Sequence, residues 1–206
     1  MYLFKSPART KLMVAATIGL AAGVFSSAPH PAAAQVKSSG APALSPELAQ
    51  VKAALDKYQD PMAAVRDGFL STVSCIDFPE GGNDGGVPYK PGAMGVHFVN
   101  MGNVGPTLDP AKPQVLMYEP VGDKLQLVAA EWFMPAQLVK EAPSVLGQKL
   151  QGPMDGHEPI MPAQLRHYDL HVWLWRENPN GTFEPTNLAV KCPAGGYTHA
   201  ERPHKH

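Results

Sequence analysis

The stretch HYDLHVWLWR, residues 167–176, combines strong strand character with two histidines and a carboxylate. Aromatic and β-branched side chains favour a pleated strand. Because side chains alternate between the two faces of a strand, the even-numbered residues from Tyr168 to Leu174 form one apolar face. The odd-numbered residues form the other face, which we predict to be the wall of a polar pocket: His167, Asp169, His171, Trp173 and Trp175.

Residues 1–34 have the features of an export signal. Lys5, Arg9 and Lys11 precede an apolar run, and small residues at 32–34 suit a cleavage site. We expect cleavage after Ala34, followed by a disordered linker over 35–44, and hence a periplasmic or secreted protein. The alternative is a single uncleaved membrane helix, although the apolar run is shorter than the ~20 residues that a span usually needs.

The rest of the chain has the size of one globular domain, which we place at residues 45–192. We expect 193–206 to be a disordered tail, whose His199, His204 and His206 would bind metal only loosely. The formal net charge of −1 gives no reason to expect nucleic acid as a partner, and no segment after the signal is apolar enough to span a membrane.

Two cysteines, Cys75 and Cys192, stand near the start and the end of the predicted domain. In an exported protein such a pair is expected to form a disulfide. The alternative is two unpaired buried thiols. We predict the disulfide, which removes both cysteines from consideration as nucleophiles.

The predicted fold is α+β: a β-rich domain, either an antiparallel sheet or a small barrel, with two N-terminal helices and long irregular loops. Ser45-Pro46-Glu47 and Asp60-Pro61 are helix start signals. We expect the second helix to run through Met62, Val65 and Phe69 and to serve as a packing element. Strands are expected over 94–100, 114–119 and 124–133, besides the one in 167–176. Irregular loops are expected over 78–92 and 143–162, and the turn at 177–181 is expected to lead into a partner strand through Phe183.

The strands over 114–119 and 124–133 form the clearest hairpin. With Glu119 opposite Lys124, Leu127 and Glu131 share a face that the pattern assigns to the core. An unpaired ionised carboxylate there would cost several kcal/mol, so Glu131 is protonated, paired with a cation or bound to a metal. Glu119 is a second acid that could serve in catalysis, or simply the solvated end of a hairpin.

The sharpest hypothesis gathers three histidines and one glutamate around a divalent cation. The predicted ligands are His97, Glu131, His157 and His171. Such a set suits Zn, Fe, Mn or Cu, and ligand softness does not choose among them. The alternative is that each histidine satisfies a separate hydrogen bond.

His167 and His171 stand four residues apart, as two zinc ligands do on a protease helix. The residues between them favour a strand, in which ~3.3 Å per residue separates the two positions by roughly 13 Å. We therefore expect only one of them, His171, to bind a given ion. His167 is an alternative ligand, and Asp169 is expected to orient an imidazole.

Several blocks resemble a group of exported bacterial proteins of unassigned function. These blocks are MGVHFVN at 94–100, VLMYEP at 115–120, GHEP at 156–159, HYDLHVWLWR at 167–176, and NPNG at 178–181 followed by a late cysteine. The resemblance implies export and a shared site. There is a looser likeness to cupin metal sites, which place histidines and a glutamate on barrel strands, although this chain lacks the adjacent His-x-His pair.

No motif in the chain names a reaction. One interpretation is a metal-dependent enzyme acting on a small molecule, with Glu131 or Glu119 as general base. A second is a binding protein that holds a metal ion or an apolar molecule in a pocket against Trp132 and Trp173 without turnover. A third is a structural envelope protein stapled by its disulfide. The sequence gives no indication of the oligomeric state.

Overall fold

The computed structural model describes residues 44–158, 161–194 and 199–201. The predicted signal over 1–34, and the linker up to residue 43, lie outside the described residues. Within the described part of the chain, no helix combines the length and the apolar character that crossing a bilayer would require.

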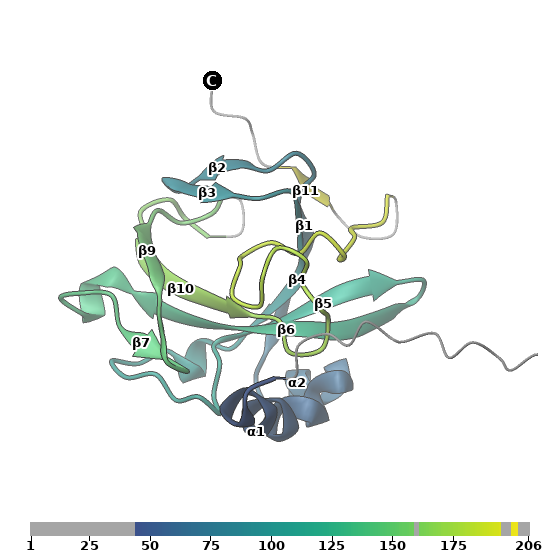
Figure 1. Cartoon of the computed structure of the whole chain (residues 1–206), viewed down its shortest axis with the longest axis horizontal. Coiled ribbons are helices and arrows are strands. Elements are labelled where there is room, and N and C mark those ends of the chain that lie inside the picture. The colour runs from purple at the N-terminus through teal and green to yellow at the C-terminus, as the bar shows by residue number, and fades with distance from the viewer. Residues whose placement is uncertain (1–43, 159–160, 195–198, 202–206) are drawn as a thin grey trace, which may run out of the picture. The chain divides into compact units, whose positions relative to one another are not determined.

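The described residues form a short helical segment followed by a β-rich body (Figure 1). The helical elements are α1 (Pro46–Leu55), η1 (Asp56–Gln59) and α2 (Pro61–Arg66), with later 3-10 turns η2 (Met101–Asn103) and η3 (Ala136–Leu138). The strands are β1 (Leu70–Phe78), β2 (Gly82–Asp84), β3 (Val87–Tyr89), β4 (Gly92–Val99), β5 (Val115–Val121), β6 (Lys124–Pro135), β7 (Ser144–Val145), β8 (Gln148–Lys149), β9 (Gln151–Met154), β10 (His167–Val172) and β11 (His199–Glu201).

Seven of the strands make one sheet in the order β11-β1-β4-β5-β6-β10-β9. All neighbours in it run antiparallel except β1 and β11. The sheet curls into a half-barrel, with α1 and α2 on one side and the small β2–β3 hairpin on the other (Figure 1). This confirms the predicted class, a β-rich α+β domain with two N-terminal helices.

The two helices begin where the sequence predicts. Ser45 caps α1 by accepting a hydrogen bond from the Leu48 amide, and Asp60 caps α2 by accepting one from the Met62 amide. The second helix is shorter than predicted, because α2 ends at Arg66 and does not reach Phe69. Met62 and Val65 are exposed, and Ala64 is the buried residue of α2. A helix of only six residues presents one side chain to the sheet rather than a stripe.

The sheet is buried on both faces. Its convex face packs against α1 and α2 through large side chains such as Tyr118 and Trp132, together with the even-numbered residues of β10. The odd-numbered residues His167, Asp169 and His171 lie on the concave face, as the alternation predicts. Trp175 is the exception, because β10 ends at Val172 and Trp175 packs on the convex side.

The predicted register of the β5–β6 hairpin is wrong. Lys124 lies opposite Val121, and Glu119 lies opposite Gln126, because the chain reverses over two residues, at a glycine with φ of 61°, and not over four. One extra residue, Val128, then interrupts the ladder in a bulge. The bulge places Leu127 on the convex face, while Glu131 keeps the concave face.

Three loop predictions need correction. The segment 78–92 contains the β2–β3 hairpin, and 143–162 contains β7, β8 and β9. The turn at 177–181 leads into no strand among the described residues; Asn187 instead makes an isolated bridge with Ala93. Short strands with two to four residues leave too little periodicity in a sequence to be distinguished from irregular chain.

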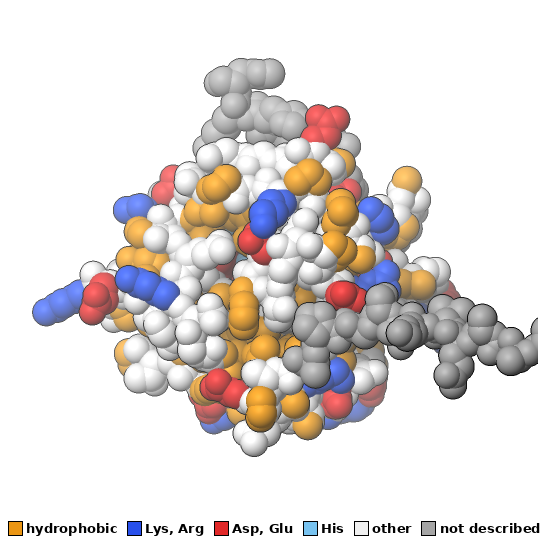
Figure 2. Space-filling view, in the orientation of Figure 1, with side chains coloured by type: hydrophobic (Ala, Val, Ile, Leu, Met, Phe, Trp, Pro, Cys, Tyr) orange, Lys and Arg blue, Asp and Glu red, His pale blue; other side chains and the backbone are white. Residues whose placement is uncertain are grey.

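The predicted disulfide between Cys75 and Cys192 is confirmed, with the two Cα atoms 5.7 Å apart. It joins β1 to the irregular segment that contains Cys192, across a sequence separation of 117. Within the range expected to be a disordered tail, residues 199–201 form β11 and pair with β1. On the face shown in Figure 2, acidic and basic side chains are interspersed, in keeping with the near-zero net charge.

Candidate metal centre

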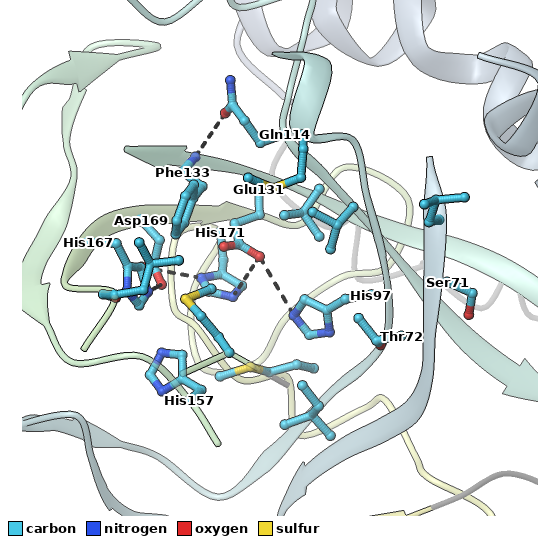
Figure 3. Close-up of a pocket in the computed structure, with 18 of the residues that line it drawn as sticks. Ser71, Thr72, His97, Gln114, Glu131, Phe133, His157, His167, Asp169 and His171 are labelled. Carbon is cyan, nitrogen blue, oxygen red and sulfur yellow. Dashed lines mark hydrogen bonds and ion pairs between the residues drawn. The ribbon is translucent and has the colours of Figure 1, made fainter. Parts of the chain in front are cut away.

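A cavity of about 380 Å³ opens on the concave side of the sheet (Figure 3). Much of its wall is apolar, formed by Met94, Val115, Phe133, Met161 and Leu165 among others. Six ionisable side chains also line it: His97, Glu131, His157, His167, Asp169 and His171. The cavity therefore has both an apolar wall and a cluster of side chains that can bind a metal ion.

His97, Glu131 and His171 form the first group, each from a different strand of the sheet. Each side chain contributes a ligand atom that lies within 4.8 Å of the other two, and all three residues are buried. Nε2 of His97 is 3.6 Å from Oε2 of Glu131, and Nε2 of His171 is 3.7 Å from the same oxygen (Figure 3). The Glu131 carboxylate thus lies between two imidazoles.

His171 is held in place without hydrogen bonds to its ring. The side chain is 3 % exposed, and neither Nδ1 nor Nε2 has a hydrogen-bond partner among the described residues. A buried polar group without a partner costs roughly 1–3 kcal/mol. Such an imidazole can bind a metal ion through Nε2, on the side of Glu131, while Nδ1 lies 3.8 Å from Oδ1 of Asp169.

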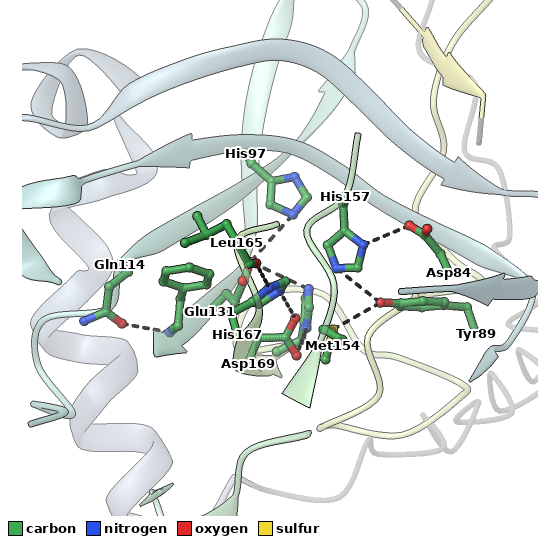
Figure 4. Close-up of polar contacts among 12 residues, drawn as sticks. Asp84, Tyr89, His97, Gln114, Glu131, Met154, His157, Leu165, His167 and Asp169 are labelled. Carbon is green, nitrogen blue, oxygen red and sulfur yellow. Dashed lines mark hydrogen bonds and ion pairs between the residues drawn. The ribbon is translucent and has the colours of Figure 1, made fainter. Parts of the chain in front are cut away.

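His157, His167 and Asp169 form a second group, again with ligand atoms within 4.8 Å of one another. Nδ1 of His157 is 2.8 Å from Oδ2 of Asp84, and its Nε2 is 3.5 Å from the Tyr89 hydroxyl (Figure 4). Nδ1 of His167 is 3.2 Å from the Leu165 carbonyl oxygen. The structure therefore divides the predicted four-residue site, because His157 lies with His167 and Asp169.

The two buried acids of the cavity differ in how readily they lose a proton. Burial raises the pKa of Glu131 well above its ordinary value, and the charge of Asp169 raises it further. Burial also opposes ionisation of Asp169, but the nearby histidines, first His171 and then His167, outweigh it and lower the pKa of Asp169. Burial lowers the pKa of His171, which favours the neutral, metal-binding imidazole.

No fixed cation balances these acids inside the cavity. Among the described residues that line it, none is lysine or arginine. Buried carboxylates are normally paired with a cation or bound to a metal. Histidines are the only basic groups among the described residues that line the cavity, and a bound cation would compensate both Glu131 and Asp169.

Three residues that the sequence suggested for this site lie elsewhere. Glu119 does not line the cavity; its Oε1 accepts a hydrogen bond from the Lys191 amide, and its Oε2 is 3.5 Å from Arg176. Trp132 lies on the convex side and donates to the Asp109 carbonyl. Trp173 packs in the core on the concave side but does not line the cavity, and it donates to the Glu184 carbonyl.

The structure also adds residues that sequence reasoning missed. Gln114 lines the cavity; its Oε1 accepts from the Phe133 amide and its Nε2 donates to the Asn103 carbonyl. Asp84 and Tyr89 reach His157 from the β2–β3 hairpin. The glycines around Asp84 predicted only an irregular loop, and nothing in their spacing indicates which side chain contacts His157.

No protein-family model, curated protein or solved structure matches this chain. The resemblance to exported bacterial proteins and the likeness to cupin metal sites therefore stay predictions. Function has to be argued from the geometry of the cavity and from the chemistry of the residues that line it.

Proposed function

We propose that this protein binds a divalent transition metal ion through His97, Glu131 and His171 at the floor of the cavity. The observation that carries the proposal is the pair of Nε2 to Oε2 separations, 3.6 and 3.7 Å, in a buried group. These separations exceed the ~3.2 Å upper range of ordinary hydrogen bonds. They match instead the spacing of atoms that are ligands to the same ion.

Simple geometry supports this interpretation. Nitrogen and oxygen ligands lie ~2.0–2.2 Å from zinc, so two ligands at tetrahedral angles lie roughly 3.3–3.6 Å apart. Ligands at right angles around an octahedral ion would lie closer, roughly 2.8–3.1 Å apart at the same bond lengths. The observed separations agree better with the tetrahedral arrangement, in which three protein ligands leave one position for water or for another small ligand.

Two imidazoles and one carboxylate suit several metals. The set occurs in catalytic zinc sites and, with octahedral geometry, in non-haem iron sites. Manganese and copper also accept these ligands. The tetrahedral spacing favours zinc, and the neutral imidazole that burial favours at His171 is the form that binds any of these ions.

Metal analysis of the purified full-length chain tests the proposal. We expect one equivalent of zinc per chain to be lost in a His97→Ala and in a Glu131→Gln variant, each still folded by near-ultraviolet circular dichroism. A His204→Ala/His206→Ala variant controls for loose binding by the tail and is expected to retain this metal. Metal that persists in both site variants and is lost only from the tail variant would contradict the proposal.

The cavity above the first group supports a second candidate function, catalysis on a small, largely apolar molecule. A metal with an open position is the arrangement of catalytic zinc sites, and the wall beside it is formed by Met94, Val115 and Phe133. Azide added to the cobalt-substituted protein tests the open position. A change in the visible spectrum supports an exchangeable site, and an unchanged spectrum would favour metal binding without turnover.

We infer that the protein acts outside the cytoplasm. The disulfide between Cys75 and Cys192 supports this location, because such bonds persist in oxidising compartments. The basic and apolar pattern of residues 1–34 supports it independently. Mass spectrometry of the secreted or periplasmic fraction tests both, with a mature chain that begins at Gln35 as the expected result and an uncleaved cytoplasmic chain as the contradicting one.

A further inference from the structure

The structure assigns a second cation site to His157, His167 and Asp169, beside the group that contains His171. The site stands on its own residues; only the pairing of two ions in one cavity also rests on the proposed first site. It would take the same class of ion, a divalent transition metal that accepts two imidazoles and a carboxylate.

Both histidines of this group have their Nδ1 atoms engaged. The ring of His157 donates from Nδ1 to Asp84 at 2.8 Å, and the ring of His167 lies with Nδ1 3.2 Å from the Leu165 carbonyl oxygen. A carboxylate or a carbonyl behind the distal nitrogen is the usual support of a metal-bound histidine. Each contact sets the tautomer, with the proton on Nδ1 and the lone pair on Nε2.

The two Nε2 atoms have only weak contacts of their own. Nε2 of His167 is 3.7 Å from Oδ2 of Asp169, which is beyond hydrogen-bonding distance. Nε2 of His157 has a contact with the Tyr89 hydroxyl at 3.5 Å, the outer limit for a hydrogen bond. The rings lie edge to face with centroids 5.1 Å apart, so both nitrogens can turn toward one ion (Figure 4).

Asp169 is the observation that points to a ligand. Its side chain is only 3 % exposed, and Oδ1 has no hydrogen-bond partner among the described residues. A carboxylate buried in this way needs a cation close to it. With Oδ2 facing His167, a metal ion between the two side chains supplies that cation and completes the second site.

Asp169 also connects the two groups. Its Oδ1 lies 3.8 Å from Nδ1 of His171, whose Nε2 faces Glu131 in the first group. One carboxylate can thus bind the second ion through Oδ2 and orient the first ion's histidine through Oδ1. Two divalent ions carry four positive charges, and the carboxylates of Glu131 and Asp169 compensate two of them. A centre that holds both ions would therefore also bind an anion such as hydroxide.

The assignment is tested by titrating the metal-free full-length chain with Co²⁺ alone. The readouts are the visible absorption spectrum and the amount of cobalt bound per chain. We expect two equivalents in the wild type and one in each of His157→Ala and Glu131→Gln. Asp84→Asn neutralises the carboxylate behind Nδ1 of His157. We expect it to weaken the second equivalent about 10- to 100-fold and leave the first unchanged.

The outcomes separate the two proposals. One equivalent that is lost in Glu131→Gln and kept in His157→Ala overturns the second site and leaves the first. One equivalent that is lost in His157→Ala and kept in Glu131→Gln overturns the first site and supports the second. No cobalt in a folded wild type overturns both, and His167→Gln replaces His157→Ala if that variant does not fold.

Discussion

His171 lies directly opposite Glu131 across the β6–β10 pair, and its Nε2 is 3.7 Å from the Oε2 of that glutamate. Residues directly opposite each other on antiparallel strands have Cβ atoms ~4.5–5.5 Å apart. The backbone ladder therefore sets the separation of the two candidate ligands before any metal arrives. His97 reaches the same carboxylate from β4, two strands away. A site built on strands in this way is more rigid than one built on loops.

The first prediction concerns Glu131 in metal-free protein. The raised pKa of Glu131 means that the folded protein keeps a proton that the unfolded chain has already lost. Unfolding then releases a proton, so the free energy of unfolding falls as pH rises above the unfolded value of about 4.3. We expect chelator-treated Glu131→Gln to be more stable than wild type at neutral pH, by about 1–4 kcal/mol, with the difference vanishing toward pH 4.

Urea unfolding of both proteins between pH 4 and pH 8 measures this difference. Zinc at about 1,000 times its Kd should reverse the order, because it stabilises the folded wild type by about 4.1 kcal/mol and the glutamine variant lacks the site. If the metal-free Glu131→Gln variant is less stable than wild type at every pH, the Glu131 carboxylate does not destabilise the metal-free fold and the prediction is wrong.

The second prediction concerns Gly95 on the strand that carries His97. Gly95 has φ of +88°, and a Cβ at this position would collide with the Tyr118 carbonyl oxygen on β5. Backbone strain of this kind costs about 1–3 kcal/mol for a non-glycine residue, and the collision adds to it. We expect Gly95→Ala to lose more than about 3 kcal/mol of stability and to weaken metal binding by displacing His97.

Gly105→Ala is the matched control, because an added Cβ there meets no atom within 4 Å and the backbone has no positive φ. Thermal unfolding and cobalt binding of the two variants give the comparison. Equal stability of Gly95→Ala and Gly105→Ala would show that β4 can move away from β5 without cost.

The concave face of β10 was predictable from sequence, because His167, Asp169 and His171 alternate with apolar residues at a period of two. The burial of Glu131 was predictable for the same reason. The face on which Leu127 lies was not predictable. The bulge at Val128 reverses the alternation of faces along the strand, and no residue type marks the position of the bulge.

The division of the histidines into two groups was also beyond the sequence. His157 stands in a segment with no strand periodicity, so only the folded chain shows that it lies near His167 and Asp84. Trp132 and Trp173 have the side-chain type expected of a pocket wall, yet their ring nitrogens bind backbone carbonyls in other parts of the fold. Side-chain chemistry alone does not distinguish a pocket from a core.

The third prediction concerns the disulfide between Cys75 and Cys192. In the chain-entropy model, a cross-link across 117 residues restricts the unfolded chain enough to stabilise the fold by about 5 kcal/mol. We expect Cys75→Ser/Cys192→Ser, or reduction of the wild type, to lower the urea midpoint strongly and to leave little folded protein at 37 °C. Urea unfolding with and without dithiothreitol measures the effect, and an unchanged midpoint would contradict it.

The fourth prediction concerns the contact between η1, which follows α1, and the segment after β10. Nε1 of Trp175 donates to Oδ1 of Asp56 at 2.6 Å, across 119 residues of sequence. This hydrogen bond is the first cause of the lowered pKa of Asp56. Because the carboxylate is half exposed, we expect Asp56→Asn to cost only about 1 kcal/mol.

The pH dependence of this contact follows from the direction of the shift. A lowered pKa in the folded state means that the stabilisation is present above the unfolded value of about 3.9 and is lost as pH falls through the lower, folded value. Trp175→Phe keeps the ring but removes the donor, so a double-mutant cycle with Asp56→Asn isolates the bond. We expect a coupling of about 0.5–1.5 kcal/mol at pH 7 that declines below pH 4. Additive losses at pH 7 and below pH 4 alike would show that this hydrogen bond does not stabilise the fold.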